Sequence, residues 1–180
     1  DASMHTVDLV REGFHAAVRQ GIGPWAGLES ERLFEQPSFI VVGSPSAARR
    51  LVGAQPEALA REPLLGDNDV WKDWFAAAGL RVNVRTVAVF NDAGLMLQAA
   101  EQSLGLALAR EIHAADALID GRLVRLSPIT VTHEEAQPYH LVYPPALRDW
   151  PPLDAFRRWL RDELDQSMAA LHRSEATRGM

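Results

Sequence analysis

The sequence predicts an α/β fold with two lobes and a ligand cleft between them. Apolar runs of strand length alternate with helical segments through most of the chain, which favours parallel strands joined by right-handed crossovers. Of the 180 residues, 47% are apolar, so the chain can bury a sizeable core. We expect residues 44–136 to form one lobe, and residues 1–43 with 137–180 to form the other.

Short runs of apolar and β-branched residues predict the strands, and polar or proline-containing starts predict the helices. The expected strands cover residues 15–19, 38–43, 82–90, 106–110 and 139–144, with a short extended piece at 122–126. The expected helices cover residues 44–52, 56–62, 67–79, 93–104 and 111–121, and a last helix begins at residue 151. Glycines and a proline make the stretch QGIGPWAG, residues 20–27, a loop.

The expected helix at 93–104 has two different sides. Its apolar stripe should face its own sheet, and consists of Ala93, Met96, Leu97, Ala100 and Leu104. The other side mixes apolar with polar residues, namely Leu95, Gln98, Ala99 and Gln102. A mixed side of this kind suits a protein partner better than bare solvent, so it is a candidate for contact with a second copy.

Composition narrows the classes of function. The formal net charge of −6 and the scattered basic residues argue against a nucleic-acid binder, which usually carries a basic face. The chain contains no cysteine, which excludes disulfides, thiolate metal sites and a cysteine nucleophile. No apolar run approaches the roughly 18 residues of a membrane-spanning helix, and the opening residues show no signal-peptide pattern. We therefore expect a cytoplasmic protein without membrane contact.

The sequence shows no motif for catalysis, metal binding or cofactor binding. Ser44 lies outside any G-x-S-x-G context, and GIGPWAG contains a proline and opens no helix, unlike a phosphate-binding loop. His113 and Asp116 are three residues apart, and His133 and His140 flank a carboxylate pair, but neither spacing matches a metal site. We therefore expect no enzyme activity, no metal and no cofactor.

Polar or flexible residues follow three of the expected strands. Ligands of open α/β sheets bind beyond the carboxyl ends of the strands, so we expect these residues to meet in one pocket. They are Arg19, Gly21, Gly43, Ser44, Asn91 and Asp92. Because a guanidinium and a carboxylate are both present, an amphoteric ligand such as an amino acid or a peptide suits them best.

Each candidate also has a purely structural interpretation. Ser44 and the pair Asn91-Asp92 have the residue types that cap helices. Arg19 is equally well explained by an ion pair at the edge of a lobe. Trp25 is able to cover a cleft, but a tryptophan in a glycine- and proline-rich loop more often packs on that loop.

Several motifs in order resemble one known family. VDLVREGFHAAVRQGIGPWAGLESERLF, FNDAGLMLQAAEQSLGLALAR, ALIDGRLVRL and YHLVYP resemble consecutive segments of the LysR-type transcriptional regulators. The similarity is to the branch that contains the glycine-cleavage activators and the β-lactamase regulators. It covers roughly residues 6–165.

This resemblance implies a function and a set of binding residues. The family's sensor half is a two-lobed α/β domain like the periplasmic binding proteins, and a small effector binds between its lobes. By position, the cleft-lining segments correspond to Arg19 and Gly21, Gly43 and Ser44, Asn91 and Asp92, and Tyr139. The implied function is effector sensing by a transcriptional regulator. A solute-binding protein of a transport system, with the same cleft, is the alternative.

The resemblance also implies partners. Family members are dimeric through sensor-domain contacts, and they bind DNA through an N-terminal helix-turn-helix that this chain lacks. The chain opens near the VDL motif, so we expect the sensor's own first strand and helix to be missing and the first lobe to be incomplete. Since that helix faces the 93–104 helix of the other subunit in the family, we expect a weakened or altered dimer with an exposed apolar patch.

Overall fold

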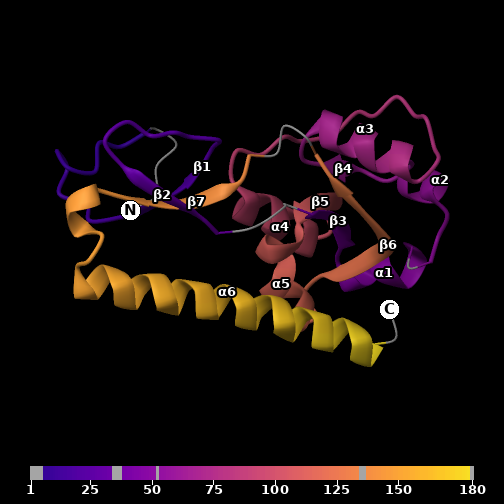
Figure 1. Ribbon diagram of the computed structural model, residues 1–180. Helices are drawn as coiled ribbons and strands as arrows, with labels where there is room; N and C mark the ends of the chain where they lie inside the picture. The colour runs from indigo at the N-terminus through magenta and orange to yellow at the C-terminus, as the bar shows by residue number, and fades with distance from the viewer. Residues whose placement is uncertain (1–5, 34–37, 52, 134–136, 179–180) are drawn as a thin grey trace. The chain divides into compact units, whose positions relative to one another are not determined.

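The chain folds into two compact units in its computed structural model, which describes residues 6–33, 38–51, 53–133 and 137–178 (Figure 1). Unit 1 comprises Asp1–Pro37 and Glu134–Asp165, and unit 2 comprises Ser38–His133 and Gln166–Met180. The division differs from the expected one at residues 38–43 and 166–180, which were predicted in the first lobe and belong to unit 2. The strand at 38–43 shows why. The predicted first lobe included that strand, whereas the strand belongs to unit 2 because it pairs on both sides within the unit 2 sheet.

Unit 1 contains a three-stranded antiparallel sheet in the order β1-β7-β2. Its strands are β1 (Ala17–Gln20), β2 (Glu29–Arg32) and β7 (Tyr139–Tyr143). A short η1 (Pro145–Leu147) follows β7, and the first part of α6 (Pro151–Arg178) packs its Leu153 against Leu141 and Tyr143. The strand β2 escaped prediction because its sequence, ESER, has no apolar residue.

Unit 2 contains a four-stranded sheet in the order β4-β5-β3-β6. Its strands are β3 (Ser38–Gly43), β4 (Leu64–Leu65), β5 (Leu106–Arg110) and β6 (Val124–Thr132). The strand β4 is parallel to β5, but β3 is antiparallel to both β5 and β6. The expectation of parallel strands is therefore wrong for β3, and it is also wrong for β1 and β7 of unit 1, which pair antiparallel. It applies to β4, β5 and β6, which run in one direction and are linked through helices, as the crossover rule requires.

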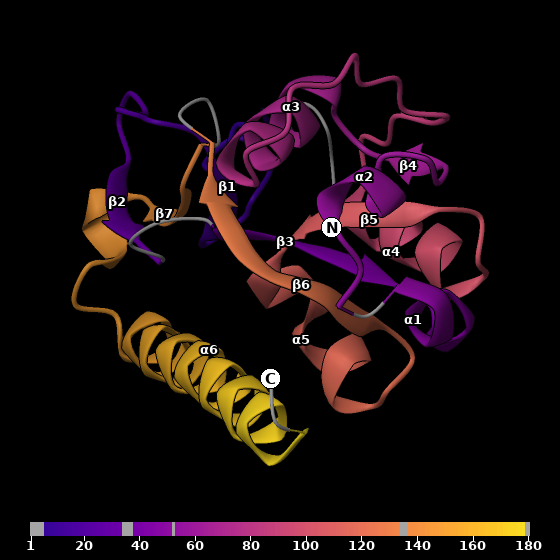
Figure 2. The same ribbon diagram turned by 90° about the vertical axis from the view of Figure 1, so that its right-hand side faces the viewer.

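The last part of α6 also belongs to unit 2, where its Leu171 is buried in the core. Five further helices surround the sheet in the described part of unit 2 (Figure 2). They are α1 (Pro45–Leu51), α2 (Pro56–Leu59), α3 (Asn68–Ala77), α4 (Ala93–Glu101) and α5 (Glu111–Ile119). The side chains of Asp67 and Asp92 cap α3 and α4 by accepting a hydrogen bond from a backbone N–H of the first turn. The helices α4 and α5 bury alanine, leucine and methionine side chains against β3 and β5.

Residues 82–90 do not form the expected strand. Only Ala88 makes a β-bridge, to Leu65, and the rest of the segment has no regular structure. The segment is nevertheless anchored to the sheet edge, because Val87 N–H donates to Leu64 O at 2.8 Å and Gly66 N–H donates to Ala88 O at 2.9 Å. Val87 and Val89 point outward, with 64% and 68% of their surface exposed, whereas Val84 is buried and Ala88 and Phe90 pack against the core of unit 2.

The two sides of α4 differ from the predicted ones at two positions. Met96, Leu97 and Ala100 are buried as expected, but Leu104 is 62% exposed because the helix ends at Glu101. Ala99, assigned to the outer side, is buried in the core of unit 2. Leu95 is 55% exposed and remains on the outer side. Among the helices of the described residues, none is both long enough and apolar enough to cross a membrane.

Candidate functional site

Three of the predicted binding residues lie together in unit 1. Gln20 is the register partner of Tyr139, and Gly21 N–H donates to Pro138 O at 3.0 Å, so the end of β1 adjoins the start of β7. Successive side chains of a strand point to opposite faces. Since Arg19 is paired with His140, these two side chains share one face, and Tyr139 lies on the other.

The guanidinium of Arg19 is held by backbone. Its Nη2 donates to the carbonyl oxygen of Val7, so the predicted pairing with an acid at the lobe edge is not what the structure shows. Trp25 packs on its own loop, where a Cβ added to Gly21 or to Gly23 would lie 3.1 Å from the indole. The indole also meets the ring of His140 edge-on, with centroids 5.2 Å apart.

Ser44 is a buried helix cap. Its side chain accepts a hydrogen bond from Ala47 N–H at 3.2 Å, and the residue is only 2% exposed. Its Oγ also lies 2.8 Å from Oγ of Ser46 and accepts a hydrogen bond from Ser103 at 2.8 Å. The neighbouring Gly43 leaves no room for a side chain, because an added Cβ would lie 3.0 Å from Cδ1 of Leu126.

Asn91 and Asp92 lie at the opposite end of α4 from Ser44. Both are exposed, and Asp92 caps the helix by accepting from Leu95 N–H at 2.8 Å. Ser103, which touches Ser44, follows the last turn of the same helix. A helix of nine residues is roughly 14 Å long, so the structure does not bring Ser44 and Asp92 together.

Two further residues act on the same site as Asp92: Arg110, which the sequence reasoning missed, and His113, which it considered only as a metal ligand. The charges of Arg110 and Asp92 both act on the imidazole of His113, which lies in the first turn of α5. Arg110 ends β5 and directly precedes α5, just as Asn91 and Asp92 directly precede α4. A charged residue between an apolar strand and a helix was the available signal, and LALAR ends in one.

Burial and neighbouring charges change the pKa of His113. Arg110 is only 9% exposed, and its guanidinium carbon lies 5.5 Å from the centre of the Phe39 ring. Burial, reinforced by the positive charge of Arg110, lowers the pKa of His113 below its ordinary value of 6.5, while Asp92 opposes this shift. The imidazole is therefore kept neutral at neutral pH, beside one cationic and one anionic side chain.

A hydrogen-bonded ion pair lies next to this group. Glu111, the first residue of α5, accepts from Ser38 Oγ at 3.0 Å and from Arg125 at 3.2 Å. Both partners of the ion pair are mostly buried. It fastens α5 to β3 and β6, and so fixes the backbone from which Arg110 and His113 project. Among the described residues, no cluster of histidine, aspartate and glutamate has the arrangement of a metal site.

Comparison with known proteins identifies the family. Residues 1–165 match the model of the LysR substrate binding domain. The HTH-type transcriptional activator AmpR of Citrobacter koseri is 34% identical over 164 residues, which are 87% of this chain and 53% of that protein. The glycine cleavage system transcriptional activator of Escherichia coli K12 is 29% identical over 160 residues, 85% of this chain and 50% of that protein. The chain thus spans about half the length of these relatives.

Solved structures agree with the family match. The effector domain of AmpR from Pseudomonas aeruginosa superposes with a TM-score of 0.71 at 32% identity, covering 94% of this chain and 80% of that one. The regulatory domain of CrgA from Neisseria meningitidis, at 20% identity and a TM-score of 0.65, shares the fold over 90% of this chain and 81% of that one. The chain therefore belongs to the LysR family of transcriptional regulators: it is the effector-binding domain of such a regulator, and not an enzyme.

Proposed function

We propose that this domain senses a small amphoteric metabolite, such as an amino acid or a short peptide. In unit 2 the binding residues are Asn91 and Asp92, joined by Arg110 and His113. In unit 1, Arg19, Gly21 and Tyr139 remain proposed ligand contacts of their own, on the two faces of the sheet where β1 adjoins β7. Gly43 and Ser44 are not retained, because Ser44 is buried in contacts at the far end of α4.

The observation that supports this proposal most is the meeting of opposite charges around His113. Asp92 is exposed and offers a carboxylate to a ligand ammonium group. Arg110 offers a guanidinium within the electrostatic range of the same imidazole. Because Arg110 is largely removed from water, its attraction for a ligand carboxylate is less screened than at an exposed site.

The test begins with a thermal-shift screen of amino acids and short peptides against this chain. A bound ligand stabilises the folded state by mass action and raises the melting temperature. For the best hit, Asp92→Asn is the informative variant, because asparagine caps helices as well as aspartate does but carries no charge. We expect its dissociation constant to rise at least about tenfold, the loss typical of a charge-assisted hydrogen bond.

Asp67→Asn is the matched control. Asp67 caps α3 through a hydrogen bond of 2.7 Å from Asp69 N–H, so the same chemical change is made at a cap outside the proposed site. We expect Asp67→Asn to bind the hit as the parent chain does. Equal effects of the two variants, or none from Asp92→Asn, would refute the role given to Asp92.

The activity of the complete regulator is also part of this proposal. The relatives are named HTH-type transcriptional regulators, and this chain corresponds to about half of their length. We propose that a part of the regulator outside these residues binds DNA, that effector binding here changes that activity, and that the protein works in the cytoplasm. The net charge of −6 predicts that this chain alone gives no salt-sensitive, sequence-specific shift of DNA in a gel.

A solute-binding protein of a transport system was the alternative. The curated relatives matched at 28–34% identity over most of the chain are transcriptional regulators, and none of those named is a transport protein. No specific feature of the structure favours the alternative, so it is not proposed further.

A further inference from the structure

Unit 2 has a pocket that is separate from the residues proposed to hold the effector. Its volume is about 480 Å³, within the range that binds drug-sized molecules. It is lined by residues of α2, of the turn before β4, of α3 and of the segment 80–85. None of the residues around His113 is part of its lining.

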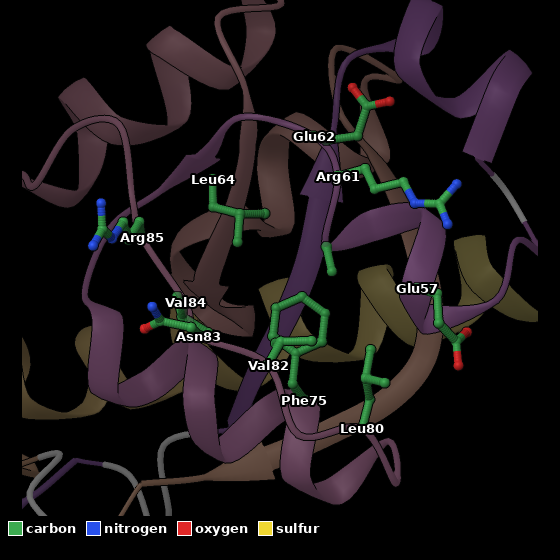
Figure 3. Close-up of a pocket in the computed structure, with 11 residues that line it drawn as sticks. Glu57, Arg61, Glu62, Leu64, Phe75, Leu80, Val82, Asn83, Val84 and Arg85 are labelled. Carbon is green, nitrogen blue, oxygen red and sulfur yellow. The ribbon is translucent and has the colours of Figure 1, made fainter.

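The floor of this pocket is apolar. Leu64 and Phe75 are 3% and 1% exposed, and Phe75 stacks on Trp71 with ring centroids 5.5 Å apart, so this part of the floor is fixed by the core. Leu80 and Val82 are partly exposed beside them. In Figure 3, Phe75, Leu80 and Val82 lie close together at one end of the pocket. Covering this surface with an apolar ligand would remove it from water, which is favourable.

The rim carries positive charge. Arg85 and Asn83 lie on one side of the pocket and Arg61 and Glu57 on the other (Figure 3). Neither arginine makes an ion pair with another residue in the part of the chain that the structure describes. Of the two acids in the lining, Glu62 is paired with Arg50, whose guanidinium donates two hydrogen bonds to it at 2.8 and 3.2 Å, and Glu57 lies on the side of Arg61, away from Arg85.

The position of Arg85 is fixed by its backbone. The next residue, Thr86, donates its N–H to the side chain of Asn68 at 2.9 Å, and Val87 N–H donates to Leu64 O. These two bonds tie the segment to the start of α3 and to β4. Arg85 is therefore presented from an anchored stretch of chain, although residues 80–86 have no regular secondary structure.

We propose that this pocket is a second ligand site for a carboxylate with an apolar body. The guanidinium of Arg85 and the side-chain amide of Asn83 hold the carboxylate, since a planar guanidinium fork matches a carboxylate better than other acceptors. The apolar body lies on Leu80, Val82 and Phe75. Arg61, on the opposite side, adds to the positive potential that attracts the anion.

The test uses 4-phenylbutyrate as the probe, with uncharged 4-phenylbutyramide as its isosteric control. Binding is measured by calorimetry, and the site is mapped by amide NMR. We expect 4-phenylbutyrate to shift the amides of residues 60–64 and 80–85 while leaving those of Asn91 and Asp92 in place. We expect the amide analogue to bind at least about tenfold more weakly, because it lacks the charge.

Two variants and one control decide whether the pocket is responsible. Arg85→Ala should weaken binding of 4-phenylbutyrate about tenfold or more, as loss of a charge-assisted pair does. Val82→Asp should do the same by placing a negative charge on the floor. Arg81→Ala is the control, because Arg81 is an exposed arginine of the same segment that does not line the pocket. Equal losses in Arg81→Ala and Arg85→Ala, shifts confined to other residues, or no binding of 4-phenylbutyrate would each overturn the proposal.

Discussion

Ser103 donates a hydrogen bond of 2.8 Å to Oγ of Ser44 and so joins the end of α4 to the start of α1. Ser46 closes the group, with its Oγ 3.0 Å from that of Ser103. Ser103 has a φ of 63°, in the left-handed region that side chains other than glycine rarely adopt. The three hydroxyls therefore hold a backbone conformation that is unfavourable by itself, at the end of α4 opposite to Asp92.

Two substitutions at Ser103 separate the hydrogen bonds from the backbone strain. Ser103→Ala loses the hydroxyl but keeps a Cβ on a residue in the left-handed conformation. We therefore expect the free energy of unfolding to fall by about 1–2 kcal/mol. Ser103→Gly loses the same hydroxyl but relieves the strain, and should be about 1 kcal/mol more stable than Ser103→Ala. Urea unfolding of both variants measures the difference. If Ser103→Gly is the less stable of the two, the φ of 63° at this position does not destabilise the folded state as proposed.

Local sequence signals predicted most helices and failed on strand direction. The caps Asp67 and Asp92, and the apolar spacing in α3 to α5, depend on residues within a few positions of each other, and these elements form as expected. The direction of β3 depends on how it pairs with β5, some 60 residues later, which no local pattern encodes. Because β3 and β5 are antiparallel, the residues that follow β3 and the residues that follow β5 lie at opposite ends of the two strands. For this reason the prediction that Ser44 shares a pocket with Asp92 is wrong, since the two lie at opposite ends of α4.

Gly105 allows the close approach of β5 to the turn before β4. A Cβ added at Gly105 would lie 2.6 Å from the backbone oxygen of Pro63 and 2.9 Å from Cγ of Leu65. Gly105→Ala should therefore lower the free energy of unfolding by about 2–3 kcal/mol, as overpacking does in a fixed core. Gly94→Ala is the control, since its new methyl group would meet only Oδ1 of Asp92, at 3.1 Å. Chemical denaturation of the two variants should separate them clearly, and equal stabilities would contradict the predicted clash.

The lowered pKa of His113 makes stability depend on pH in a defined direction. The folded state favours the neutral imidazole, so the unfolded state binds the proton more readily as the pH falls. The resulting contribution is present above the unfolded value of 6.5 and is lost as the pH falls through the folded pKa. His113→Gln should therefore lose less stability than the parent chain between neutral and mildly acidic pH. Denaturation curves at several pH values test this, and parallel pH profiles would show that His113 does not contribute.

Tyr143 should ionise at a higher pH than an ordinary tyrosine. Burial, together with the 2.6 Å hydrogen bond that its hydroxyl donates to Glu31, raises the pKa of Tyr143 to about 12. Deprotonation would place a phenolate beside the Glu31 carboxylate, which Arg161 also binds, at 2.5 Å. The chain has two tyrosines, so the tyrosinate absorbance on alkaline titration should contain a late phase near this value. Tyr143→Phe should abolish that phase, and a phase near this value that survives in the variant would contradict the assignment.

The outer side of α4 should mediate self-association. Leu95 is 55% exposed on this helix, and Val87 and Val89, which are also mostly exposed, come shortly before it in the chain. Exposed apolar side chains of this kind are typical of protein interfaces and unfavourable in water. We propose that a second copy covers them, and we expect Leu95→Glu to raise the dimer dissociation constant at least about tenfold, since it places an uncompensated charge in the contact. Gln98→Glu is the control, because it adds the same negative charge at another exposed position of α4. It shows whether dissociation comes from the loss of a contact at Leu95 or from repulsion between negative charges. Light scattering over a dilution series gives both constants. If Leu95→Glu and Gln98→Glu dissociate alike, or if both remain as associated as the parent chain, Leu95 is not in the contact and another surface must join the copies.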